Sequence, residues 1–267
     1  MATAIPEITR LWKNALRAGS LAEDWPLAQL FHDAAPNYNE ETPSRLRLSH
    51  GKDCARCHWF EHHHPELATP RGTERVSHTM GHIWEAIALG ALDYALAQHP
   101  EFTFERDWMQ KELTLPEIPS IKGHCDGAIY WNGEPWAIVD PKFTKFFAHR
   151  WWFPRLDKGE QPSHLKGRIP PETWGYRHQA GNYLASSGLP FKGFVWVVGF
   201  KDSESLSLGW ADADELLPYN KRAIADYRAA MSDVIPPPIH PMRDAAPCMD
   251  KRYKKVYCNF HQSCLEV

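Results

Sequence analysis

The stretch GHCDGAIYWNGEPWAIVDPK, residues 123–142, decides how this chain is organised. Two arms rich in strand-forming residues flank Asn132-Gly133, which is the strongest short signal for a β-hairpin turn. Asp126 lies on the first arm, and Asp140 and Lys142 lie on the second. An antiparallel return therefore brings Asp126 beside Asp140, although 13 residues separate them in the chain.

The register of this hairpin decides whether the two aspartates can act together. A strict two-residue turn would place Asp126 opposite Val139 and put Asp140 on the other face of the pleat. A three-residue loop or a bulge would place both aspartates on one face, with Lys142 beside them, and we predict that arrangement. Two acids and a lysine on one face suit metal-assisted phosphodiester hydrolysis, in which carboxylates hold Mg²⁺ and a lysine positions water or stabilises charge.

The alternative is that these residues are ordinary surface charges on a hairpin. The apolar run Trp136-Ala137-Ile138-Val139 directly precedes Asp140 and indicates a central, buried strand. A solvated charge is not expected there, which favours a functional role.

The remaining chain predicts an α/β sheet with flanking helices. Apolar periodicity predicts a long helix over 78–98 that carries Glu85, and further helices over 173–187 and 213–233, the last with Pro218 near its start or splitting it. A continuous apolar run predicts a strand over 191–200, and residues 107–117 and 123–142 supply three strand candidates.

We divide the chain into an N-terminal helical and irregular segment, 1–50, a core, 51–235, and a cysteine-rich tail, 236–267.

Whole-chain properties set limits on the class of protein. The formal net charge of −3 argues against a histone-like polycation but leaves room for a local basic groove. The chain has no 18-residue apolar run and no signal-peptide pattern at its N-terminus. We therefore expect a cytoplasmic protein, in a reducing compartment and without membrane contact. The cytoplasm of a bacterium that is the host of a phage is one such compartment.

Two segments are candidates for nucleic-acid contact. Residues 143–172 are basic, aromatic and Pro-rich, and either form a single-stranded nucleic-acid path or a packed aromatic loop. Residues 45–66 are locally basic and contain a run of histidines that either ligate metal or lie in a solvated loop. The residues that we expect to contact nucleic acid are Arg56, Lys145, Arg150, Trp151 and Arg155.

The six cysteines are unevenly distributed. Five lie near the two ends of the chain, at Cys54, Cys57, Cys248, Cys258 and Cys264. Without a secretory signal, this distribution favours a metal site over a disulfide framework. Cys125, on the hairpin, is expected to be a buried small hydrophobic residue.

Four motifs occur in the order seen in the PD-(D/E)XK nucleases, and the chain resembles their RecB-like branch, which includes phage-type exonucleases and CRISPR-associated iron–sulfur nucleases. The motifs are Gly81-His82-Ile83-Trp84-Glu85, Gly123-His124-Cys125-Asp126-Gly127, Val139-Asp140-Pro141-Lys142, and Gln179 through Tyr183. The resemblance covers roughly residues 45–264. It implies a restriction-endonuclease-like core with a central mixed sheet flanked by helices.

The resemblance also implies roles for the site residues. Asp126 and Asp140 would bind Mg²⁺ or Mn²⁺, Lys142 would orient or activate water, and Gln179 and Tyr183 would hold DNA or brace the lysine. Relatives carry a metal-binding His where this chain has Trp84, which favours a site held by the two aspartates and a backbone carbonyl with Glu85 assisting. His82 is expected to point elsewhere on the helix.

In the cluster-bearing subgroup, the cysteines hold a 4Fe-4S cluster that staples the N-terminal segment to the tail. Four of the five terminal cysteines would serve here, with either Cys57 or Cys248 as the fourth ligand. Tetrahedral Zn²⁺ is the alternative to the cluster.

The hypothesis is therefore a metal-dependent DNA nuclease. We expect an exonuclease that acts on single strands or duplex ends in recombination, repair or CRISPR-type processing. A homo-oligomer or a recombination or CRISPR protein partner is compatible with it. The alternatives are a catalytically impaired nuclease fold that serves as a nucleic-acid-binding or assembly subunit, and a zinc-stapled RNA-processing enzyme.

Overall fold

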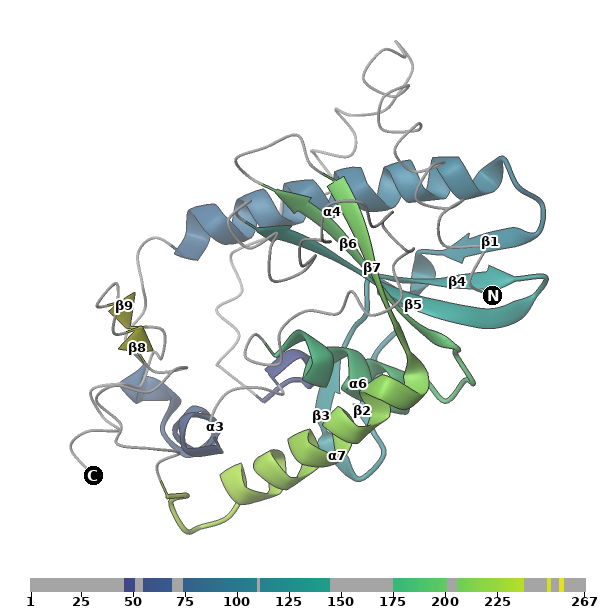
Figure 1. Cartoon of the computed structure of the whole chain (residues 1–267). Helices are drawn as coiled ribbons and strands as arrows, with labels where there is room; N and C mark the ends of the chain where they lie inside the picture. Colours follow the sequence, from purple (N-terminus) through teal and green to yellow (C-terminus); the bar gives the residue numbers. More distant parts are fainter. Residues whose placement is uncertain are drawn as a thin grey trace, which may run out of the picture.

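A mixed five-stranded sheet in the order β1-β4-β5-β6-β7 forms the centre of the computed structural model (Figure 1). Its strands are β1 (Phe102–Glu105), β4 (Gly127–Trp131), β5 (Glu134–Thr144), β6 (Gly193–Phe200) and β7 (Leu206–Asp212). Only the β5–β6 pair is parallel, and the other pairs of this sheet are antiparallel. The structure describes residues 46–50, 55–68, 74–109, 111–144, 175–200, 206–237, 249–250 and 255–256.

Helices cover both faces of the sheet (Figure 1). α4 (Glu74–Ala97) lies on one face, and α6 (Tyr176–Ser186) and α7 (Ala213–Ala230) lie on the other. The smaller elements are α3 (Ala55–His63), three short 3₁₀ helices (Leu48–His50, called η1; Pro65–Leu67; Asp107–Met109), and the strand pairs β2–β3 (Leu113–Leu115, Ile118–Gly123) and β8–β9 (Met249–Asp250, Lys255–Val256). The predicted α/β class and the three predicted long helices are confirmed.

The hairpin has a bulge between its turn and Asp126. Asn132 and Gly133 both have positive φ, 51° and 79°, as a tight two-residue turn demands, and Trp131 pairs with Glu134. The register then shifts between Ile129 and Tyr130, so that Gly127 pairs with Val139. Continuing that register places Asp126 beside Asp140, and the predicted bulge is confirmed.

Residues of β5 alternate between two buried cores, as expected for a central strand. Ile138 packs into the core beneath α6 and α7, and Ala137 and Val139 pack into the core beneath α4. Asp140 and Lys142 are two and four residues after Ile138, so their side chains lie on the same face of the sheet as that of Ile138, toward α6. Strands β1 and β7 are absent from the sequence-based prediction, because short edge segments have little periodicity.

A buried polar network joins α6, α7 and η1. Asn182 Nδ2 donates to the carbonyl oxygen of Leu48 at 2.8 Å, and Asn182 Oδ1 accepts from Asn220 Nδ2 at 3.0 Å. Tyr227 donates its hydroxyl hydrogen to the carbonyl oxygen of Arg47 at 2.7 Å. Leu46 and Leu48 are buried and belong to the core beneath α6 and α7.

The histidine-rich segment is a helix rather than a loop, which corrects the prediction. α3 packs on α7, and His58 is fully buried with its ring stacked on Tyr227 at 5.7 Å between centroids. Arg56, predicted to contact nucleic acid, is buried and donates from Nη1 to the carbonyl oxygen of Pro236 at 3.4 Å. Its long apolar stem explains how a charged residue serves as a packing element here.

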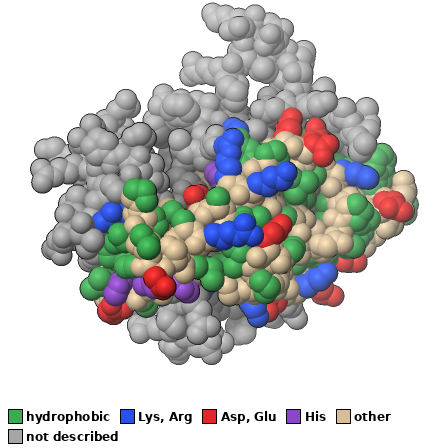
Figure 2. All heavy atoms as spheres, turned by 90° about the horizontal axis from the view of Figure 1, so that it is seen from below, with side chains coloured by type: hydrophobic (Ala, Val, Ile, Leu, Met, Phe, Trp, Pro, Cys, Tyr) green, Lys and Arg blue, Asp and Glu red, His purple; other side chains and the backbone are tan. Residues whose placement is uncertain are grey.

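Side chains of every class are mixed on the face of the molecule seen from below in Figure 2. Lysine, arginine, aspartate and glutamate side chains are interspersed with apolar ones over the described surface in that view. None of the helices in the described ranges is long and apolar enough to cross a membrane.

Replacing Asn182 by alanine should lower the free energy of unfolding by about 3 kcal/mol, because the Leu48 carbonyl and the Asn220 amide lose their partner inside the core. Urea denaturation measures the change. Lys221→Ala, at an exposed position on the same helix pair, is the control and should change stability by less than about 0.5 kcal/mol. Equal effects of the two substitutions would contradict this account of the network.

Candidate active site

Asp140 is the centre of the site. Its side chain is almost fully buried, 1% exposed, on the central strand β5. Lys142 Nζ lies 2.7 Å from Oδ1 and 2.6 Å from Oδ2. The Oδ1 contact has the direction of a hydrogen bond, whereas Oδ2, which has no hydrogen-bond partner among the described residues, is held by the ammonium group as an ion pair.

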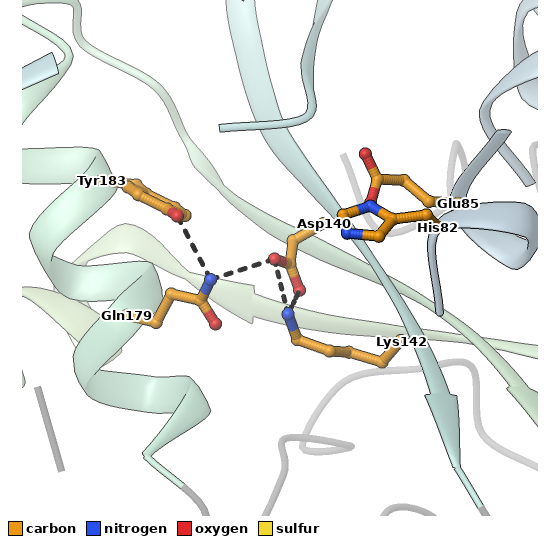
Figure 3. Close-up of polar contacts among 6 residues, drawn as sticks. All are labelled: His82, Glu85, Asp140, Lys142, Gln179 and Tyr183. Carbon is orange, nitrogen blue, oxygen red and sulfur yellow. Dashed lines mark hydrogen bonds and ion pairs between the residues drawn. The ribbon is translucent and has the colours of Figure 1, made fainter. Parts of the chain in front are cut away.

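α6 supplies the second contact to Asp140 (Figure 3). Gln179 Nε2 donates to Asp140 Oδ1 at 3.2 Å and to the Tyr183 hydroxyl oxygen at 3.2 Å. Gln179 and Tyr183 are both buried, and their spacing of four residues places them on one face of the helix. The predicted grouping of these residues with Asp140 and Lys142 is therefore present, with Gln179 in contact with the carboxylate rather than with the lysine.

Asp126 adds a second acid to the site. Burial raises the pKa of Asp126 well above its ordinary value, and the charges of Asp140 and Glu85 raise it further. Burial also raises the pKa of Asp140, although the Lys142 ammonium group opposes this rise. Repulsion between nearby carboxylates in a buried site is relieved either by a proton or by a cation.

Lys142 remains charged in this setting. Burial alone would lower the pKa of Lys142, but the surrounding negative charge, led by Asp140, outweighs burial and raises it. The ammonium group therefore offsets one of the two carboxylate charges and leaves the other unbalanced.

Glu85 approaches the acidic pair from α4, on the opposite side of Asp140 from α6 (Figure 3). His82 Nδ1 lies 3.5 Å from Glu85 Oε2, one turn earlier on the helix. This contact corrects the expectation that His82 points elsewhere. The hydrogen bond to Glu85 raises the pKa of His82, against the opposing effect of burial.

Trp84 of α4 has a packing role. Its ring stacks on Phe143 at 5.3 Å between centroids. A Cβ atom at Gly199 would lie 2.4 Å from Trp84 Cζ2, so only glycine leaves room for the indole there. Trp84 thus anchors α4 against β5 and β6, and the position does not direct a side chain to the acidic pair.

The donor set fits a hard divalent cation. The buried carboxyl group of Asp140 and the adjacent carboxyl group of Asp126 supply oxygen ligands, and Lys142 balances the charge of only one of the two. No group of three His, Cys, Asp or Glu side chains within the described ranges is placed to hold a metal by itself. Mg²⁺ characteristically binds to one or two carboxylates and completes its coordination with water and substrate phosphates, so two carboxylates suffice.

Tyr176 is a site residue that the sequence analysis missed. Lys142 Nζ lies 5.1 Å from the centroid of its ring. A signal was available, because Tyr176, Gln179 and Tyr183 are spaced three and four residues apart and so share one helix face.

Cys125 is buried beneath the site as predicted. Burial and the neighbouring Asp126 charge raise the pKa of its thiol to about 12. A thiol in that state is unreactive at neutral pH, which fits a packing residue.

Several predicted site residues are not tested by this geometry. Cys57 lies half-buried on α3. The other four candidate cluster ligands, Cys54, Cys248, Cys258 and Cys264, lie outside the described residues, as do Lys145, Arg150, Trp151 and Arg155. The cluster and the nucleic-acid path stay predictions.

Comparison with known proteins assigns no family. Neither a protein-family model nor a curated protein sequence matches the chain. Among solved structures, the crystal structure of SSO0001 is similar, with 16% sequence identity and a TM-score of 0.35, over 74% of this chain and 83% of that chain. The function is therefore argued from the geometry.

The raised pKa of Asp126 predicts a pH-dependent stability of the metal-free protein. A carboxyl group whose pKa is higher in the folded than in the unfolded state stabilises the fold at low pH, and this contribution is lost as pH rises from the ordinary value through the raised one. Asp126→Asn should therefore raise the free energy of unfolding at neutral pH, by on the order of 1 kcal/mol, and flatten its pH dependence. Denaturation from pH 4 to pH 8 measures both effects.

The matched control for this prediction is Asp233→Asn, at an exposed position after α7. It should change neither the stability nor its pH dependence. If Asp126→Asn destabilises the protein at every pH, the two carboxyl groups do not repel each other as described.

Proposed function

We propose that the chain is a Mg²⁺- or Mn²⁺-dependent nuclease that hydrolyses phosphodiester bonds in DNA. The observation that carries this proposal is the bulged register of the β4–β5 hairpin, which sets Asp126 beside Asp140 and puts Lys142 on the same face. That DNA is the polymer is inferred from the resemblance of the ordered motifs to RecB-like nucleases.

Asp126 and Asp140 would hold the cation, which supplies charge neutralisation at the phosphate and a more acidic water. Gln179 fixes the rotation of the Asp140 carboxyl group through Oδ1, while Oδ2 is paired with the Lys142 ammonium group. Lys142 places a permanent positive charge at the edge of the acidic pair, where it can orient a water molecule or stabilise the negative charge that develops on phosphate. Glu85 lies farther out and adds negative charge to both aspartates.

The proposed metal–cysteine staple receives indirect support. Arg56 and Trp59 of α3 donate to the carbonyl oxygens of Pro236 and Ser232, at 3.4 Å and 2.9 Å. The helix that carries Cys57 therefore lies against the start of the C-terminal tail. A 4Fe-4S cluster or Zn²⁺ held by four of the five terminal cysteines would add a second tie between the same two segments.

A nucleic-acid-binding or assembly subunit is the second candidate. Its specific support is that Trp84 of α4 serves packing and Glu85 pairs with His82, and that no group of three possible metal ligands forms among the side chains that the structure describes. The two candidates differ in whether the protein cuts the DNA that it binds.

A nuclease assay on end-labelled linear and circular DNA, single- and double-stranded, tests the proposal. The full chain should cut DNA with Mg²⁺ or Mn²⁺ and lose this activity in EDTA. Lys142→Met should lower the rate at least about 100-fold, which corresponds to about 2.7 kcal/mol of transition-state stabilisation. Lys192→Met, at an exposed lysine just before β6, is the matched control and should cut at the rate of the original protein.

Calorimetric titration with Mn²⁺ separates the two candidates. Binding that is lost in Asp140→Asn, together with cleavage, supports the nuclease. DNA binding without cleavage, and without Mn²⁺ binding that depends on Asp140, would establish the binding subunit instead. An absorption band near the 400 nm region, in protein purified without oxygen, would show iron–sulfur rather than zinc at the cysteines.

A further inference from the structure

The first turn of α6 presents an aromatic ring to the site. Tyr176 is the first residue of the helix, and Gly175 before it has φ of 75°, a conformation that strongly favours glycine. Gly175 also accepts a hydrogen bond at its carbonyl oxygen from the Gln179 amide at 2.9 Å, which closes the first turn. The helix therefore starts abruptly, with the Tyr176 ring 5.1 Å from Lys142 Nζ.

Lys142 consequently has two kinds of partner. The Asp140 carboxylate attracts it as an opposite charge at 2.6–2.7 Å, and the Tyr176 ring attracts it through its electron-rich face. The Asp140 carboxylate is buried, which strengthens its attraction for the ammonium group, and the Tyr176 ring is partly shielded from water.

The two attractions respond differently to occupation of the site. Asp140 already accepts from Gln179, and it is also the carboxylate proposed to hold a cation. A cation bound to Asp140 would neutralise part of its negative charge and so weaken its attraction for Lys142. The attraction of the ring does not depend on the charge of Asp140, so it persists.

We propose that Tyr176 is a positioning residue for Lys142, and that its ring keeps the ammonium group in place when the charge of Asp140 is shared. This inference rests on the proposed nuclease function for its kinetic consequence, whereas the contact itself can be tested without metal or DNA.

The contact is measured by NMR of metal-free protein that carries ¹³C-labelled lysine. A ring close to the ammonium group shifts the neighbouring methylene signals of Lys142 upfield, and the absence of these signals in Lys142→Met assigns them. Tyr176→Phe should keep the upfield shift, while Tyr176→Leu and Tyr176→Met should both lose it. Tyr219→Leu is the matched control, because Tyr219 contacts Arg177 and His178 of the same helix but makes no described contact with Lys142.

Kinetics then test the role in catalysis. Tyr176→Leu and Tyr176→Met should lower kcat about tenfold with KM for DNA changed less than about twofold, Tyr176→Phe should restore the rate, and Tyr219→Leu should leave kcat unchanged. A rise in KM without a fall in kcat, or an unchanged kcat in both aliphatic variants, would overturn the proposal. An unshifted Lys142 signal in the original protein would overturn it too, whether or not the protein proves to be a nuclease.

Discussion

The structure depends on a carboxylate that is buried at the middle of a sheet. Asp140 follows four apolar residues on β5 and is almost completely removed from water. Such a charge is costly unless it is paired and hydrogen-bonded. Lys142 on the same strand and Gln179 on α6 meet that requirement, and both depend on the sheet and helix being packed as observed. The site and the core are consequently one structural unit.

The second acid is the feature of this arrangement that stability does not explain. A salt bridge between Asp140 and Lys142 alone would be a balanced pair. Asp126 adds a negative charge that Lys142 does not balance, and Glu85 on α4 adds another. A protein that served only stability would gain nothing from keeping these acids together, so the excess negative charge is the best physical argument for a cation site.

Much of the fold follows from sequence patterns whose physical basis is local. The long helices, the buried strands β5 and β6 and the turn at Asn132-Gly133 were predictable from periodicity and turn chemistry. The edge strands β1 and β7 and helix α3 were not, because they take their form from neighbours. α3 illustrates the point: its histidines suggest a polar loop, yet His58 packs against Tyr227 and Arg56 reaches the carbonyl oxygen of Pro236.

The sequence by itself determined the hairpin and its turn, and so brought Asp126 near Asp140 and Lys142, because turn formation depends on residues close together in the chain. It did not determine whether the two aspartates share a face, which the register of the hairpin decides. For them to share one, the hairpin needed an extra residue, which the bulge after Ile129 provides. Only the tertiary structure decided that Trp84 is a packing residue, that His82 turns to Glu85, and that Tyr176 lies against Lys142. These contacts join elements distant in the chain, and their geometry depends on how helices α4 and α6 pack on the sheet.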